Sequence, residues 1–125
     1  MPQIKNQWNS FHIKQCKKAF GQAVLSDEHS LFLFQEDFGK LIHSNPVAVF
    51  EPKTIVEAQA LIRYAHEHQL PITVRGNGLS QSGQALAVHG GLILSMKHFN
   101  KASEADADSI WVEANTTWSS LLEHS

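Results

Sequence analysis

The feature that most constrains the fold of this chain is a strand, a capped helix and a second strand in direct succession. Residues 47–50 read VAVF, and residues 54–57 (TIVE) match a capping box, in which the threonine hydroxyl and the glutamate carboxylate satisfy free amides of a new helix. The helix is predicted to run to about His68, and residues 72–74 (ITV) follow as a strand. Strands joined by one crossover helix pair in parallel, so this order predicts an α/β fold with a small parallel sheet.

Further elements are predicted on both sides of this unit. Apolar residues at helical spacing predict an extra N-terminal helix that ends at Gly21. Residues 29–46 are aromatic and irregular, which is typical of a connector packed on a core. Residues 92–95 are expected to form a third strand of the sheet, and residues 109–118 alternate well enough to predict a fourth. Thr117 is the candidate cap of a last helix.

The apolar side chains predict which surfaces are buried. One face of the crossover helix is expected to pack on the sheet, and it carries Ile55, Ala58, Leu61, Ile62 and Ala65. Trp111 and Trp118 flank the predicted fourth strand, where packing in a core is the plain interpretation. Cys16 lies in the N-terminal helix without a partner and is expected to be a small buried thiol rather than a nucleophile.

Length and charge narrow the function. A chain of 125 residues suits one globular domain, and a net charge of -2 provides no basic field for a nucleic acid. A single cysteine and an N-terminus without an apolar leader predict a cytoplasmic location, and no segment approaches the length of a membrane span. No metal site is expected, because His66 and His68 lie two apart on a helix and face different directions.

The second strand leads directly into a glycine-rich run, residues 75–85 (RGNGLSQSGQA). Glycines at the carboxyl end of a parallel strand let backbone amides approach a ligand closely, and the usual ligand there is a phosphate. A Walker loop is excluded, because Gln84 and Ala85 stand where its lysine and hydroxyl belong. A Rossmann fingerprint is weak, because Gln81 replaces its third glycine. The remaining interpretation is a loop that binds a diphosphate through amides and small polar side chains.

Residues 45–100 resemble the start of the flavin-binding domain in the vanillyl-alcohol oxidase superfamily, and most closely that of cytokinin dehydrogenases. In that family a strand delivers a segment of the form R-G-x-G-H-S-x-x-G-Q-A, whose glycines and serine wrap the flavin pyrophosphate. The resemblance extends upstream to residues 36–39 (EDFG) and downstream to residues 111–123 (WVEANTTWSSLLE). The residues that match the segment are Arg75, Gly76, Gly78, Ser80, Gly83, Gln84 and Ala85.

The resemblance implies a fold and a cofactor site. Residues 36–125 would form the first lobe of an FAD-binding domain, incomplete without a second lobe, and residues 1–35 would form an N-terminal helix and connector. Arg75 could pair with a flavin phosphate or with an acidic residue on a neighbouring element. Leu79 replaces the histidine that commonly bonds to the flavin, so FAD would be held non-covalently. The implied cofactor-binding residues are Val74, Arg75, Gly76, Asn77, Gly78, Leu79, Ser80, Gly83 and Gln84.

Two functions follow from this resemblance. In the first, the chain is part of a flavin-dependent oxidoreductase that oxidises a small substrate of amine or alcohol type, and no catalytic residue can be named. In the second, it is a truncated, non-catalytic relative that serves as a nucleotide-binding or interaction module. In either case half a cleft would bind FAD weakly or only in an assembly, and the open face could mediate self-association.

Overall fold

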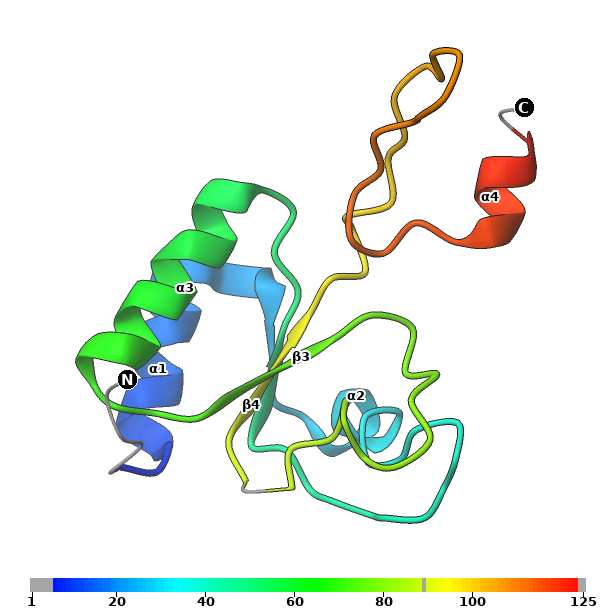
Figure 1. Cartoon of the computed structure of the whole chain (residues 1–125). Helices are drawn as coiled ribbons and strands as arrows, with labels where there is room; N and C mark the ends of the chain where they lie inside the picture. The colour runs from blue at the N-terminus through cyan, green and yellow to red at the C-terminus, as the bar shows by residue number, and fades with distance from the viewer. Residues whose placement is uncertain (1–5, 89, 124–125) are drawn as a thin grey trace.

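The computed structural model of the chain describes residues 6–88 and 90–123, and within them one sheet has four strands (Figure 1). The spatial order is β1-β2-β4-β3, formed by Val24–Leu25, Ala48–Phe50, Leu92–Ser95 and Ile72–Arg75 respectively. β4 pairs in parallel with both β2 and β3, whereas β1 pairs antiparallel with β2. The three segments predicted to share one parallel sheet therefore do so.

The helices begin and end largely where local sequence signals predict. α1 (Ser10–Phe20) begins after Asn9, whose side chain accepts a hydrogen bond from the His12 amide, and stops at Gly21 with φ 58°. α3 (Ile55–Glu67) begins after Thr54, whose hydroxyl accepts from the Glu57 amide at 3.2 Å. α4 (Trp118–Glu123) begins after Thr117, as predicted, and a short 3-10 helix, η1 (Gly21–Ala23), follows α1.

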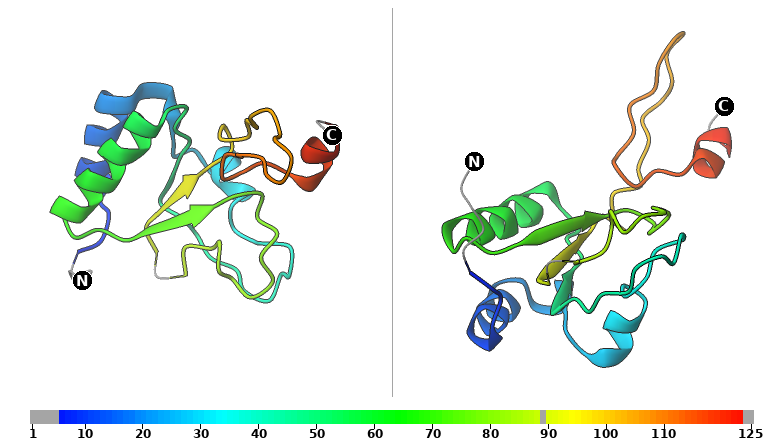
Figure 2. Two further views of the ribbon diagram at one scale, coloured as in Figure 1. Left: turned by 45° about the horizontal axis from the view of Figure 1, so that its top comes forward. Right: turned by 60° about the horizontal axis from the view of Figure 1, so that its bottom comes forward.

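Each face of the sheet has its own hydrophobic cluster, because side chains alternate along a strand. Phe50 and Leu92 point toward α1 and α3 and pack with Trp8, Cys16 and Leu61. On the opposite face the cluster is formed by Val49, Ala87 and Ile93, with Leu31 and Phe34 packed against it. Figures 1 and 2 show α1 and α3 on one side of the strands and α2 on the other.

Two elements lie where the sequence suggested only a connector. β1 extends the sheet by an antiparallel strand, and α2 (Glu28–Phe32) follows it. The signal for α2 is Asp27, which caps the helix by accepting a hydrogen bond from the Ser30 amide at 2.9 Å. The helix is only five residues long, too short for a hydrophobic periodicity to be recognised.

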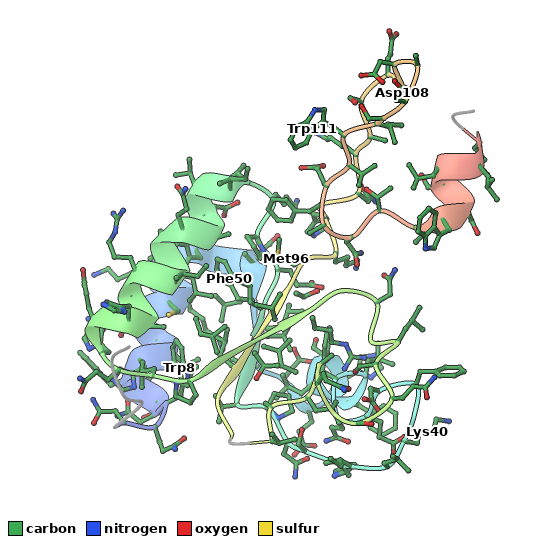
Figure 3. All side chains as sticks on the ribbon, viewed as in Figure 1. Trp8, Lys40, Phe50, Met96, Asp108 and Trp111 are labelled. Atoms are coloured by element: carbon green, nitrogen blue, oxygen red, sulfur yellow. The ribbon has the colours of Figure 1, made fainter. Side chains whose placement is uncertain are left out.

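The predicted fourth strand is wrong. Residues 101–113 fold back on themselves as an arm that extends away from the sheet, with one isolated bridge between Ala102 and Val112 (Figures 1 and 3). The arm satisfies its backbone internally, for example by a 2.8 Å bond from the Ser103 amide to the Trp111 carbonyl. Without a second layer over the arm, Trp111 is 83% exposed, and Trp118 on α4 is equally exposed. The expectation that both tryptophans are packed is therefore also wrong for this chain.

The predicted buried face of α3 was too wide. Ala58, Leu61 and Ala65 are buried, but Ile55 and Ile62 are 63% and 50% exposed. At about 100° per residue, the three buried positions form a narrow stripe, and both isoleucines lie to the same side of it. The helix is therefore rotated so that its Leu61 side faces the sheet.

Candidate functional site

The glycine-rich loop leaves the sheet at the carboxyl end of β3, the edge where ligands settle in open α/β sheets. We call residues 76–85 the diphosphate loop. Among the hydrogen bonds of residues 6–88 and 90–123, none is donated by the backbone amides of residues 76–80. Gly78 has φ 70°, a conformation that favours glycine. The loop thus contains consecutive donors without a protein partner, and those of Gly76, Asn77 and Leu79 belong to exposed residues, as binding of an anion requires.

The diphosphate loop is held from one side by the turn that contains Asp37. This carboxylate accepts hydrogen bonds from the Ser80 hydroxyl at 2.8 Å, the Gly83 amide at 2.9 Å and the Lys40 amide at 3.1 Å. Two backbone bonds join the same segments, from the Phe38 amide to the Gly78 carbonyl and from the Gly39 amide to the Ser80 carbonyl. The Asp37 side chain is only 4% exposed, so its carboxylate bonds to donors of the protein and is not available to a ligand.

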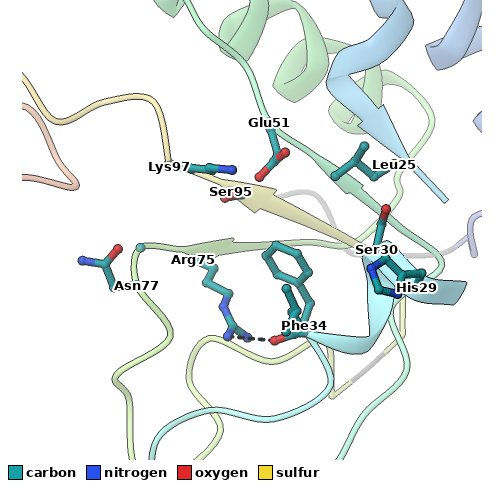
Figure 4. Close-up of a pocket in the computed structure, with 11 residues that line it drawn as sticks. Leu25, His29, Ser30, Phe34, Glu51, Arg75, Asn77, Ser95 and Lys97 are labelled. Atoms are coloured by element: carbon teal, nitrogen blue, oxygen red, sulfur yellow. Dashed lines mark hydrogen bonds between the residues drawn. The ribbon is translucent and has the colours of Figure 1, made fainter. Parts of the chain in front are cut away.

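Arg75 is directed into the protein rather than toward the loop amides. Its guanidinium donates to the carbonyl oxygens of Leu33 at 3.2 Å and Glu36 at 3.1 Å, and it lies 5.0 Å from the ring centre of Phe34. Figure 4 shows this direction, away from Asn77. Burial lowers the pKa of Arg75, and the Asp37 carboxylate partly opposes that shift. The guanidinium thus hydrogen-bonds to two backbone carbonyls, its acidic neighbour Asp37 acts on it through charge, and pairing with a flavin phosphate stays a prediction.

The diphosphate loop is held from its other side by Asn115, a residue that sequence reasoning did not single out. Its Nδ2 donates to Oδ1 of Asn77 at 3.1 Å, and its side chain is 9% exposed. A Cβ at Gly76 would lie 2.9 Å from Oδ1 of Asn115, so glycine is needed for this close approach. The only sequence signal was its place in the downstream segment of the family resemblance.

A pocket of about 470 Å³ opens beside the loop, between α2 and the carboxyl ends of β2, β3 and β4 (Figure 4). Gly76 and Asn77 line one side, Phe34 lines another, and Lys97 contributes an ammonium group. Asn77 and Lys97 also line a second, more polar pocket of about 370 Å³ that reaches Asn115. The first two residues of the unpartnered run, Gly76 and Asn77, therefore lie where the two hollows meet, and residues 78–80 line neither hollow.

The predicted cofactor-binding residues fall into two sets. Val74 and Leu79 are 57% and 67% exposed and, with the amides of residues 76–80, can meet a ligand. The remaining groups are used inside the protein: the Gly83 amide and the Ser80 hydroxyl by Asp37, and the Gln84 Oε1 by the Ser82 amide. Within residues 6–88 and 90–123 there is no group of three or more metal-ligating side chains, and no helix long and apolar enough to cross a bilayer.

These features define an α/β domain with a run of unpartnered amides and two pockets at the carboxyl edge of its parallel sheet. The chain belongs to the FAD-binding domain family, whose model matches residues 46–125. FAD fits the residues present, because the site offers unpartnered amides, the ammonium group of Lys97 and two hollows that meet at Asn77.

Individual relatives support the same assignment. The chain is 36% identical over 86 residues to an uncharacterized oxidoreductase of the fasciation locus of Rhodococcoides fascians, covering 69% of this chain and 19% of the relative. It is 38% identical over 72 residues to cytokinin dehydrogenase 5 of Oryza sativa subsp. japonica, covering 56% of this chain and 13% of the relative. The chain thus spans about a fifth or less of these relatives, and their oxidoreductase names do not favour a non-catalytic module.

A solved structure extends the likeness to the fold. Alkyldihydroxyacetonephosphate synthase superposes with a TM-score of 0.75 at 17% identity, covering 97% of this chain and 25% of that one. Because this match includes nearly the whole chain, α1 and β1 belong to the shared architecture as well as the residues that the family model matches.

Proposed function

We propose that residues 36–125 form the first lobe of the FAD-binding domain of a flavin-dependent oxidoreductase, and that the amides of residues 76–80 bind the FAD diphosphate. The observation that carries this proposal is the run of unpartnered amides at the carboxyl edge of a parallel sheet. Amides in this position offer fixed partial positive charge to an anion at no cost in reorganisation.

We expect different residues around the loop to contact different parts of FAD. Gly76 and Asn77 line the first pocket with their backbone, and Lys97 supplies positive charge at the rim of both pockets. The exposed Leu79 offers apolar contact to a flat aromatic ring. When bound, FAD would accept a hydride from a small substrate of amine or alcohol type, and the lobe would orient it. Catalytic residues are not assigned to this chain.

The attachment of FAD is proposed to be non-covalent, because the isobutyl group of Leu79 cannot form a bond to the flavin ring. Any flavin that copurifies should be released by acid or heat, and the mass of the denatured chain should equal that of the polypeptide alone. A mass increase equal to FAD would show that another residue forms the link.

The direct test is titration of the isolated chain with FAD while backbone amide resonances are followed by NMR. The amides of residues 76–80 should shift first and most, and ADP should shift the same set because it carries the same diphosphate. Since both pockets are open to solvent, we expect a Kd above about 1 μM for the isolated chain. Shifts confined to other segments, or none at millimolar FAD, would overturn the proposed site. A cytoplasmic location and self-association remain predictions.

A further inference from the structure

We infer that Asp37 is a positioning residue for FAD: its carboxylate fixes the diphosphate loop in the conformation that presents the free amides. This inference rests on the proposed function of the loop. Asp37 lies upstream of residues 46–125, which the family model matches, and no ligand contact is proposed for it.

The contacts of Asp37 all run to the backbone and side chains that shape the loop. One carboxylate oxygen, Oδ2, receives both the Ser80 hydroxyl and the Gly83 amide, while Oδ1 receives the Lys40 amide. The Ser80 oxygen in turn accepts from the Ala85 amide at 3.2 Å. One buried carboxylate therefore ties together the middle of the loop, its end and the turn below it.

This arrangement also explains why Ser80 cannot donate to a ligand. Its single hydroxyl hydrogen is directed to Asp37, so only its backbone amide remains free. The serine of the family segment would then act in this chain by holding the loop, and the diphosphate would be met by backbone groups. A carboxylate turned fully toward its own protein donors also presents little of its charge to the incoming anion.

Asp37 is suited to hold the loop as a charged group. Partial burial raises its pKa, but the hydrogen bonds from Ser80, Gly83 and Lys40 outweigh this effect and leave the pKa below its ordinary value of 3.8. The carboxylate is therefore ionised throughout the neutral range, and hydrogen bonds to an ionised acceptor are roughly twice as strong as neutral ones. The inference itself depends on the contacts and on the burial of the side chain.

The substitution Asp37→Asn keeps the shape of the side chain but removes one acceptor. If the amide oxygen faces Ser80 and Gly83, its NH₂ group opposes the Lys40 amide; if it is flipped, the NH₂ group opposes Gly83. At least one donor must then face another donor. The matched control is Asp106→Asn in the arm, where a carboxylate also accepts a serine hydroxyl and two backbone amides, those of Asp108 and Ser109, away from the loop.

The experiment measures three quantities on the full chain: Kd for FAD, Kd for riboflavin, which has no diphosphate, and hydrogen exchange of the Gly83 and Ala85 amides. Asp37→Asn should weaken FAD binding about tenfold or more, leave riboflavin binding within about twofold and accelerate both exchange rates. Asp106→Asn should change none of these. Ser80→Ala, a smaller deletion, should weaken FAD binding severalfold and serves if Asp37→Asn does not fold.

The outcomes distinguish failure of the positioning role of Asp37 from failure of the proposed FAD-binding function. Unchanged FAD affinity in folded Asp37→Asn, or in Ser80→Ala if Asp37→Asn does not fold, would overturn the positioning role. Equal losses for FAD and riboflavin would overturn it too, because they would indicate a general structural defect. If the unaltered chain binds no FAD, the proposed function fails, and faster exchange at Gly83 and Ala85 in the variant would still establish that Asp37 holds the loop.

Discussion

Gly78→Ala offers a quantitative test of how tightly the diphosphate loop is packed on its support. The glycine has φ 70°, and a methyl group there would overlap the Arg75 guanidinium, with its Cβ 2.6 Å from Cζ. The matched control is Gly21→Ala after α1, where φ is 58° and no atom lies within 4 Å of an added Cβ. Both substitutions place alanine at a positive φ, which costs backbone energy, and only the first also disturbs a neighbour.

The expected magnitudes follow from these two terms. Placing alanine in a positive-φ conformation that favours glycine costs about 1–3 kcal/mol, which is the full effect expected for Gly21→Ala. In Gly78→Ala the guanidinium must also move, which breaks at least one of its bonds to the Leu33 and Glu36 carbonyls. A hydrogen bond from a charged donor contributes about 1.5–3 kcal/mol. The free energy of unfolding of Gly78→Ala should therefore fall by at least about 1.5 kcal/mol beyond its backbone cost, whereas Gly21→Ala should lose the backbone cost alone.

Urea unfolding followed by far-UV circular dichroism measures both differences under one set of conditions. The slope with urea should be the same for both variants, since the extent of the folded core does not change. FAD binding should weaken in Gly78→Ala and not in Gly21→Ala. Equal losses of stability in the two variants would show that Arg75 is not held against the loop, and the account of the site would be wrong.

Three further predictions test other parts of the structure. Gly39→Ala should destabilise the fold and weaken FAD binding, because its Cβ would overlap the backbone of the diphosphate loop; wild-type affinity would contradict that packing. Leu61→Ala should cost about 2–5 kcal/mol of unfolding free energy, and Trp118→Ser less than about 0.5 kcal/mol, because the side chains are 0% and 83% exposed. Partial burial and the neighbouring His68 lower the pKa of His12 below 6.5. The stability from His12 is thus present above pH 6.5 and lost as the pH falls through that value toward the folded pKa. His12→Gln, which keeps a side-chain acceptor at the same helix position, should flatten unfolding free energy against pH between about 7.5 and 5.5; an unchanged slope would exclude His12 as the cause.

Several elements could be predicted from the sequence because their determinants are neighbours in the chain. The cap at Thr54 and the stop at Gly21 depend on groups within a few residues, and both helices obey them. The crossover helix between residues 48–50 and 72–75 predicted that these strands run parallel in one sheet, and they do, but each pairs with residues 92–95 between them rather than with the other. The glycine-rich segment predicted a diphosphate loop because it follows a parallel strand and resembles the family segment, and that binding role stays a prediction.

Other features depend on contacts that no local pattern encodes. Ser80 meets Asp37 across 43 residues, Asn115 meets Asn77 across 38, and the Trp8 indole donates to the Pro71 carbonyl across 63. The direction in which a long side chain such as that of Arg75 points also depends on residues far away in the sequence. A sequence cannot reveal whether a guanidinium turns to a ligand or inward, because that depends on which carbonyls the fold brings within reach.

The sequence by itself determined that this chain builds a parallel sheet with a glycine-rich loop at its carboxyl edge. The succession of strands and helices along the chain, the helix caps and the positions of the glycines are all local properties of the sequence. Only the tertiary structure decided which groups of that loop remain free. Arg75, Ser80 and Gly83 are engaged by the segment of residues 33–37, which leaves the amides of residues 76–80 as the donors. A hydrogen-bonding group is available to a ligand only if the fold has not already satisfied it, and that is settled by distant residues meeting in space.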